Sequence, residues 1–177
     1  MTIETEDTPD APPTDAPPTD AARARALLAN SSTAALATVA REPAGFPFAT
    51  LIDVADDGTG RPLLLVSDLA EHTLNLDANA AASVLIAERA ADGEPTLALG
   101  RVTIVGRVAR VSDDELAAVR QRYLTRHPQA ATYASFRDFS FRRLEPQAVR
   151  FIAGFGRMSW VTLEDYLATG ALTAPRR

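Results

Sequence analysis

The amino-acid sequence predicts a mainly β protein with short helices, in which roughly six antiparallel strands form a small closed or split barrel. Apolar runs of strand type follow one another along the chain with only short turns between them. Strands that are mostly adjacent in sequence argue against a doubly wound parallel sheet. Two glycines, Gly100 and Gly106, interrupt the longest strand-like run, where a curved sheet needs bulges or bends.

Local patterns predict each element in turn. Strands are expected at 33–39, 47–54, 62–67, 82–88, 96–111, 139–144 and 149–155, with helices at 20–30, at 71–78, from 112 to about 127 and from about 162. A turn signal at 56–60 joins the second and third strands into a hairpin. Ser112 and Glu115 form a capping box, and Pro128 ends the helix that they begin.

The chain of 177 residues suits one folded domain, expected at 21–170, with a short C-terminal tail at 171–177. Residues 1–20 contain the tandem repeat Ala-Pro-Pro-Thr-Asp and almost no large apolar side chains. Such a segment cannot bury enough surface to offset its chain entropy. We therefore predict a disordered, acidic, proline-rich tail at 1–20.

The net charge of -5 is concentrated in that tail, which holds six acids and no base and leaves the rest of the chain at +1. A folded body so close to neutral gives no electrostatic reason to expect nucleic-acid binding. No apolar run is long enough to span a bilayer, and the N-terminus lacks the pattern of a signal peptide. We expect a cytoplasmic protein with no membrane partner.

Several kinds of chemistry are excluded by composition. The sequence has no Cys, and all 18 basic residues are Arg. Thiolate catalysis, cysteine-based metal sites, lysine Schiff bases and the Walker phosphate loop are therefore absent. The two histidines, His72 and His127, lack metal-ligand spacing, so no metal site is predicted and no catalytic residue can be named. A bound cofactor is expected to supply any chemistry.

The segment from Ser67 to Thr73, called the junction below, is the most informative feature of the sequence. An apolar strand pattern stops at Ser67-Asp68, and a helical pattern begins within a few residues, with His72 beside the hydroxyl of Thr73. Free backbone amides at a helix start, together with hydroxyl and imidazole donors, are typical of a phosphate-binding site. Ser67, Asp68, His72 and Thr73 are therefore the first candidate ligand-binding residues.

Three motifs in order carry a resemblance to a known family: Pro-Phe-Ala-Thr-Leu at 47–51, Leu-Leu-Val-Ser-Asp-Leu-Ala-Glu-His-Thr-Leu-Asn-Leu at 64–76, and Gly-Arg-Val-Thr-Ile-Val-Gly at 100–106. The sequence resembles the pyridoxamine 5′-phosphate oxidase-like split barrels that bind FMN. Later motifs at 123–128, 136–139 and 154–156 are similar to the branch of haem-utilisation proteins of the HugZ type, without their additional C-terminal domain. This resemblance implies a six-stranded antiparallel split β-barrel.

The resemblance also implies a homodimer with FMN at the subunit interface and the flavin phosphate at the junction. An Arg-Lys pair of the oxidases is replaced here by His72 and Thr73, which lowers the local positive charge. By position, four further residues would lie near the flavin: Ala49, Thr50 and Leu51 on one strand, and Arg101 on the long strand. Trp160 is a candidate to cover the flavin pocket, and packing in the core explains it at least as well. The predicted function is a flavin-dependent oxidoreductase of unknown substrate.

Two alternatives stay open at this stage. A haem-binding or haem-degrading protein on the same barrel would use an imidazole as iron ligand, and His127 is one candidate for it. A structural role at the end of the helix is the better explanation of His127. The second alternative is a non-catalytic dimer that carries flavin or whose pocket has no ligand.

Overall fold

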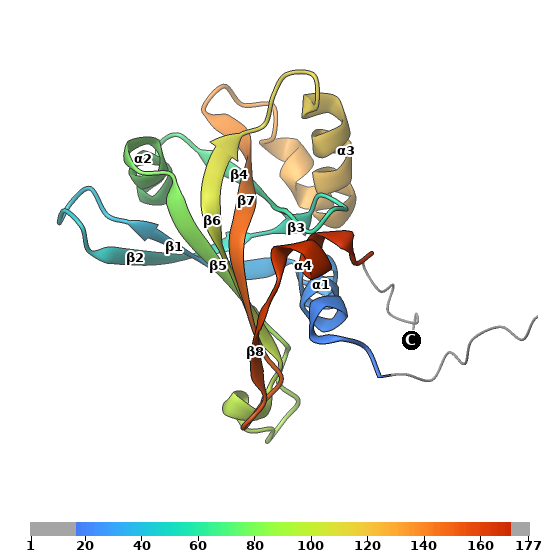
Figure 1. Cartoon of the computed structure of the whole chain (residues 1–177). Helices are drawn as coiled ribbons and strands as arrows, with labels where there is room; N and C mark the ends of the chain where they lie inside the picture. Colours follow the sequence, from blue (N-terminus) through green and yellow to red (C-terminus); the bar gives the residue numbers. More distant parts are fainter. Residues whose placement is uncertain (1–16, 171–177) are drawn as a thin grey trace, which may run out of the picture.

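The computed structural model describes residues 17–170, and these fold into one strongly curved antiparallel sheet with helices around it (Figure 1). The predicted tail at 171–177 and residues 1–16 of the predicted tail at 1–20 lie outside the described residues, whereas Asp20 already begins the first helix. The eight strands are β1 (Thr33–Val39), β2 (Pro47–Asp53), β3 (Ala55–Asp56), β4 (Pro62–Ser67), β5 (Ala81–Ala87), β6 (Arg101–Arg110), β7 (Phe139–Ile152) and β8 (Met158–Val161). The helices are α1 (Asp20–Asn30), α2 (Glu71–Ala78), α3 (Leu116–Arg126) and α4 (Leu163–Ala168), with short 3-10 turns η1 (Thr96–Ala98) and η2 (Pro128–Thr132).

The sheet has the strand order β2-β1-β5-β6-β7-β4-β3, and every pairing is antiparallel. The long strand β7 organises it. One edge of β7 pairs with β6, while its other edge pairs with β4 near its start and with β8 near its end. The mainly β class and the curved antiparallel sheet of a split barrel are thus confirmed.

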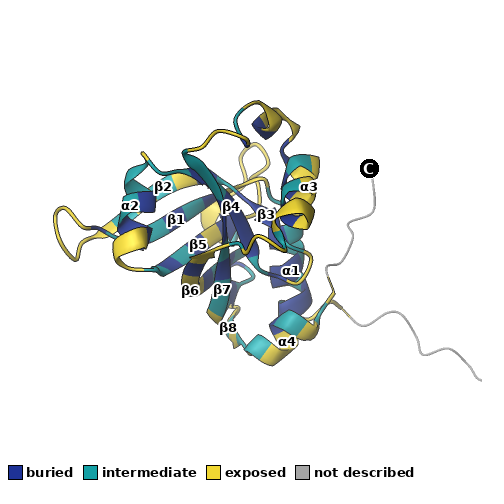
Figure 2. Cartoon of the chain, turned by 90° about the horizontal axis from the view of Figure 1, so that it is seen from above, coloured by how far each residue is buried: buried dark blue, intermediate teal, exposed yellow. Residues whose placement is uncertain are grey.

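Two hydrophobic cores lie on opposite faces of this sheet. The larger fills the concave side, where α1 and α4 contribute Leu28 and Tyr166 against apolar residues of the strands. The smaller lies under α3, where Tyr123 packs edge-to-face on Phe141, 5.5 Å between ring centroids. Figure 2 shows α1 largely buried, whereas the outward side of α3 is exposed. Helix α2 also contributes Leu76 to the larger core, at the opposite end of the barrel from α1 and α4 (Figure 1).

Some expected elements are corrected by the structure. The predicted strands 139–144 and 149–155 are one strand, β7, because Pro146 sits at the register shift opposite Gly106. A Cβ on Gly106 would collide with the backbone carbonyl of Glu145, which explains the glycine at this bulge. Gly100 precedes β6 and marks no bulge. The short strand β8 was not predicted, and the sheet has eight strands instead of six.

The predicted hairpin between 47–54 and 62–67 is also wrong. Strand β2 pairs with β1, and the turn at 56–60 instead joins the two-residue strand β3 to β4. The turn itself forms through Asp56, whose carboxylate accepts the amides of Gly58 and Gly60, both at 3.0 Å. The capping box is likewise altered: Ser112 donates to the Glu115 carboxylate at 2.7 Å, but α3 begins one residue after Glu115.

Candidate functional site

The junction between β4 and α2 forms where the sequence predicts it, and side chains distant in sequence hold it in place. The hydroxyl of Ser67 donates to the carboxylate of Asp138 at 3.0 Å and accepts the amide of Leu69 at 3.1 Å. The amide of Asp68 donates to the carbonyl of Asp138 at 2.6 Å, and the carboxylate of Asp68 pairs with Arg110 at 3.0 Å. Ser67 and Asp68 therefore shape the turn and are already engaged.

The start of α2 has no side-chain cap. Ala70 occupies the N-cap position in extended conformation and has no side-chain acceptor, while its carbonyl accepts the amides of Thr73 at 2.9 Å and Leu74 at 3.1 Å. Thr73, in the first turn, is fully buried, and its Oγ1 has no hydrogen-bond partner among the described residues. Within residues 17–170, the amides of Glu71 and His72 therefore remain the donors of the first turn without a partner, beside a buried hydroxyl.

His72 lies half-buried on α2 and contacts Thr50 on β2, with Nδ1 at 3.3 Å from Oγ1 (the tautomer sets which atom donates). Its Nε2 has no hydrogen-bond partner within residues 17–170. Burial, helped by the positive charge of Arg142, lowers the pKa of His72 below its ordinary value of 6.5. The imidazole is therefore neutral near pH 7, with one ring nitrogen free to bind a ligand.

Arg142 on β7 lies behind α2 and is only 3 % exposed. Its Nη1 donates to the carboxylate of Asp77 at 2.7 Å, and this bond holds the pKa of Asp77 below its ordinary value. Nε and Nη2 of Arg142 have no hydrogen-bond partner in the described part of the chain, and the same is true of the nearby hydroxyl of Ser140. Neither residue was singled out from the sequence.

The predicted cofactor residues fall into two groups on opposite faces of the sheet. Thr50 shares the inner face with His72, whereas Ala49 and Leu51, its neighbours on β2, point to the outer face. Arg101 and Trp160 also belong to the outer face, which the pairing register connects from β2 through β1, β5, β6 and β7 to β8. Within one chain these outer residues do not meet His72.

His127 is ruled out as an accessible ligand by its surroundings. It is 1 % exposed, its Nε2 lies 2.9 Å from the carbonyl of Val54, and its ring packs on Tyr123 at 4.7 Å between centroids. The imidazole therefore ties the end of α3 to the sheet. The structural role proposed for His127 from the sequence is the one that its contacts support.

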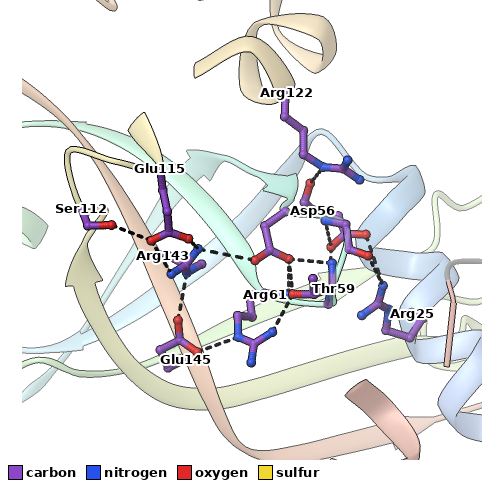
Figure 3. Close-up of polar contacts among 12 residues, drawn as sticks. Arg25, Asp56, Thr59, Arg61, Ser112, Glu115, Arg122, Arg143 and Glu145 are labelled. Carbon is purple, nitrogen blue, oxygen red and sulfur yellow. Dashed lines mark hydrogen bonds and ion pairs between the residues drawn. The ribbon is translucent and has the colours of Figure 1, made fainter. Parts of the chain in front are cut away.

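A charged groove of about 1230 Å³ lies elsewhere, between the turn at 56–60, α3 and β7 (Figure 3). Its ionisable groups largely satisfy one another. Arg143 pairs with Glu115 at 2.7 Å and with Glu145 at 2.9 Å, and Glu145 also pairs with Arg61 at 2.7 Å. The described residues contain no group of His, Cys, Asp and Glu that would hold a metal ion. No helix within 17–170 is long and apolar enough to cross a membrane.

Comparison with known proteins gives consistent matches. The chain is 42 % identical over 130 residues to non-canonical heme oxygenase HOZ, chloroplastic, from Arabidopsis thaliana, an alignment that covers 73 % of this chain and 39 % of that protein. It is 27 % identical over 160 residues to Protein CREG1 from Gallus gallus, covering 81 % of this chain and 82 % of that protein.

Among solved structures, a heme binding protein from Mycobacterium smegmatis superposes with a TM-score of 0.82 and 39 % identity, covering 88 % of this chain and 63 % of that one. The chain thus spans about two fifths of the length of HOZ and under two thirds of the mycobacterial chain. The family model described as CREG, beta-barrel matches residues 15–168, nearly the whole folded part. This chain belongs to the CREG beta-barrel family.

Proposed function

We propose that this protein is a haem-binding barrel of the HugZ-like type, with His72 as the iron ligand. The observation that carries the proposal is the state of the two imidazoles. His127 is buried and engaged, whereas His72 is neutral near pH 7 and keeps Nε2 free. Neutral imidazole is a common axial ligand of haem iron. The similarity to HOZ and to the mycobacterial heme binding protein supports this choice over flavin.

The surroundings of His72 fit the chemistry of a haem. A haem is a flat apolar ring with two carboxylates at one edge, so its site needs apolar contacts for the ring and a cation that can pair with a carboxylate. Leu69 at the junction is 83 % exposed, and Phe136, close to the Asp138 that binds the junction, is exposed as well. Arg142 supplies the cation behind α2. When bound, haem would supply the redox chemistry of iron.

Haem titration followed in the Soret region tests this proposal. We expect the native protein to bind haem in an approximately one-to-one ratio and the His72→Gly variant to lose the histidine-type spectrum. Added imidazole should restore that spectrum in His72→Gly, because the free base occupies the position of the missing ring. His127→Gln is the matched control, since glutamine can still donate to the carbonyl of Val54. An unchanged spectrum in His72→Gly would exclude the assignment.

A second copy of the chain is the proposed partner. Leu51, Leu85 and Val105 are exposed on the outer face of β2, β5 and β6, beside the small side chains of β1. Helix α3 covers the outer face only over β4 and β7 and leaves this part of it exposed. A contiguous apolar sheet surface is typical of an interface between subunits. Leu51→Arg should shift the sedimentation coefficient from dimer to monomer. Leu97→Arg, at an exposed leucine in η1, should leave it unchanged.

FMN is the second candidate ligand, favoured by one observation: the uncapped start of α2. Such a helix start binds a phosphate through its free amides, as the resemblance to the pyridoxamine 5′-phosphate oxidase-like barrels implies. The protein would then be a flavin-dependent oxidoreductase of this superfamily. Ala70→Ser offers a side-chain cap, so it should raise stability by about 0.5–1 kcal/mol and weaken FMN binding. If flavin fluorescence titration gives equal affinity for both proteins, the phosphate does not bind there.

A further inference from the structure

The interior of the barrel behind His72 contains a second set of polar groups, of which only Thr73 belongs to the junction. We propose that Arg142, Ser140 and Thr73 form a subsite for one anionic group, a carboxylate or a phosphate, of the ligand that binds beside His72. The inference rests on the proposed function, because it assigns the residues that bind the anionic group of the same ligand. The sequence-based expectation placed the anion on the junction, with Ser67, Asp68, His72 and Thr73; the proposal keeps Thr73 and adds Ser140 and Arg142 of β7.

The three residues converge by register. Ser140 lies opposite Val66 of β4, and Arg142 lies opposite Leu64. The side chains of Val66 and Leu64 both belong to the core on the concave side. Directly opposed residues share a face of the sheet, so Ser140 and Arg142 also face inward. Thr73 lies one helical turn before Asp77 on α2, and Asp77 bonds to Arg142 at 2.7 Å. Thr73 therefore faces the same region.

The unpaired polar atoms of these three residues can all donate hydrogen bonds. Four buried atoms lack a partner among the described residues: Nε and Nη2 of Arg142, Oγ of Ser140 and Oγ1 of Thr73. The two guanidinium atoms can only donate, and both hydroxyls can donate. Leaving buried donors unpaired costs about 1–3 kcal/mol each, so such groups are normally matched by a partner. A carboxylate or phosphate, which accepts several hydrogen bonds, is the partner that matches this set.

The subsite is close to solvent despite its burial. Asp77 reaches Arg142 from a position where its own side chain is 52 % exposed, so the guanidinium lies one hydrogen bond from the surface. Ser140 is the second residue of β7, at the same end of the barrel as the junction. The engaged side chains of Ser67 and Asp68 leave Arg142 as the buried cation that can receive an acidic group there.

Paired ligands that differ only in the anionic group test the subsite. Haem is compared with haem dimethyl ester, whose carboxylates are blocked, and FMN is compared with riboflavin, which lacks the phosphate. The native protein should prefer the charged member of one pair by about tenfold or more, as a charge-assisted hydrogen bond provides. Arg142→Gln should reduce this preference to about twofold or less. The pair that shows the effect identifies the source of the anion.

Arg143→Gln is the matched control, because Arg143 is the next residue on the same strand and forms ion pairs on the opposite face. It should keep the full preference. Thr73→Val preserves side-chain size and Ser140→Ala removes only the hydroxyl. Each should lower the preference by about two- to fivefold, which keeps the test valid if Arg142→Gln fails to fold. A preference that survives in all three site variants would overturn the proposal.

The outcomes separate this subsite from the haem proposal. If haem and its ester bind equally and FMN and riboflavin also show no difference, the subsite is wrong, whereas haem binding itself stands. If neither haem compound binds but FMN is preferred over riboflavin, haem is wrong and the subsite stands. If none of the four binds, inorganic phosphate is the probe: it should raise the melting temperature of the native protein more than that of Arg142→Gln at equal ionic strength. No difference overturns the subsite.

Discussion

Two buried arginines, Arg25 on α1 and Arg142 on β7, show how the same side chain serves two regions of this barrel differently. Arg25 is fully buried beside a carboxylate that is also buried, with Nη2 at 3.6 Å from Asp56. Arg142 is almost as buried, but its carboxylate partner Asp77 is half exposed. Each guanidinium has two nitrogens without a hydrogen bond among the described residues.

The difference lies in what surrounds those nitrogens. Near Arg25 the unpaired oxygen of Asp56 provides a matching negative charge, the carbonyl of Gly58 accepts at 3.2 Å, and the ring of Tyr166 lies 5.5 Å away (Figure 3 shows the turn). Near Arg142 the other unpaired atoms are hydroxyls. The fold therefore pairs Arg25 with a buried carboxylate, whereas Arg142 pairs with a half-exposed one and, in our proposal, also receives an anionic group of the ligand. Burial alone does not distinguish a structural arginine from a binding one; the nearby acceptors do.

Removal of the two carboxylate partners is the strongest test of this contrast. Asp56→Ala leaves Arg25 as a buried charge without a counterion and also removes the acceptor of two turn amides, so it should cost about 3–5 kcal/mol of unfolding free energy. Asp77→Ala exposes Arg142 to water through the space that it vacates and should cost about 1 kcal/mol. Urea unfolding of both variants measures the two values. Equal losses would mean that the two arginines play the same role.

Two glycines in the turn at 56–60 test the surroundings of Arg25 more finely. Gly60 and Gly58 have φ of +98° and +97°, so alanine is strained at both by about 1–2 kcal/mol. A Cβ at Gly60 would also collide with the buried guanidinium of Arg25, whereas at Gly58 it would meet the exposed side chain of Arg122, which can move. Gly60→Ala should therefore be less stable than Gly58→Ala by about 1–3 kcal/mol in urea unfolding. A smaller gap would show that Arg25 is loosely held.

The same contrast explains how far the sequence predicted the site. The start of α2 at Glu71 was predicted because an apolar strand pattern ends at Ser67 and a helical pattern follows at once. The roles of Ser67 and Asp68 were not predicted, because their partners Asp138 and Arg110 lie in segments far along the chain. Arg142 and Arg143 are adjacent, so alternation places one inward and one outward. The sequence does not say which, since that choice depends on the register of β7 against β4.

The smallest expected effect concerns pH and connects Arg142 to the site. Burial, and secondly the charge of Arg142, lower the pKa of His72 below 6.5 in the folded protein. Above pH 6.5 the ring is neutral in both the folded and unfolded states, and it adds no pH dependence. As the pH falls below 6.5 the unfolded chain binds a proton first, so stability falls until the pH reaches the folded pKa and the folded protein binds it too. Stability from this group is therefore present above pH 6.5 and lost on acidification.

Arg142→Gln removes the positive charge beside His72 but leaves its burial, so the pKa of His72 should rise part of the way toward 6.5. The loss of unfolding free energy on acidification should then become smaller. Imidazole proton shifts followed by NMR measure the pKa, and urea unfolding between about pH 5 and 7.5 measures the stability. His72→Gln should lack this component altogether, while Asp77, whose pKa lies below 3.8, titrates outside the window. If the titration of His72 is the same with and without Arg142, that guanidinium is isolated from the site, and its role is structural like that of Arg25.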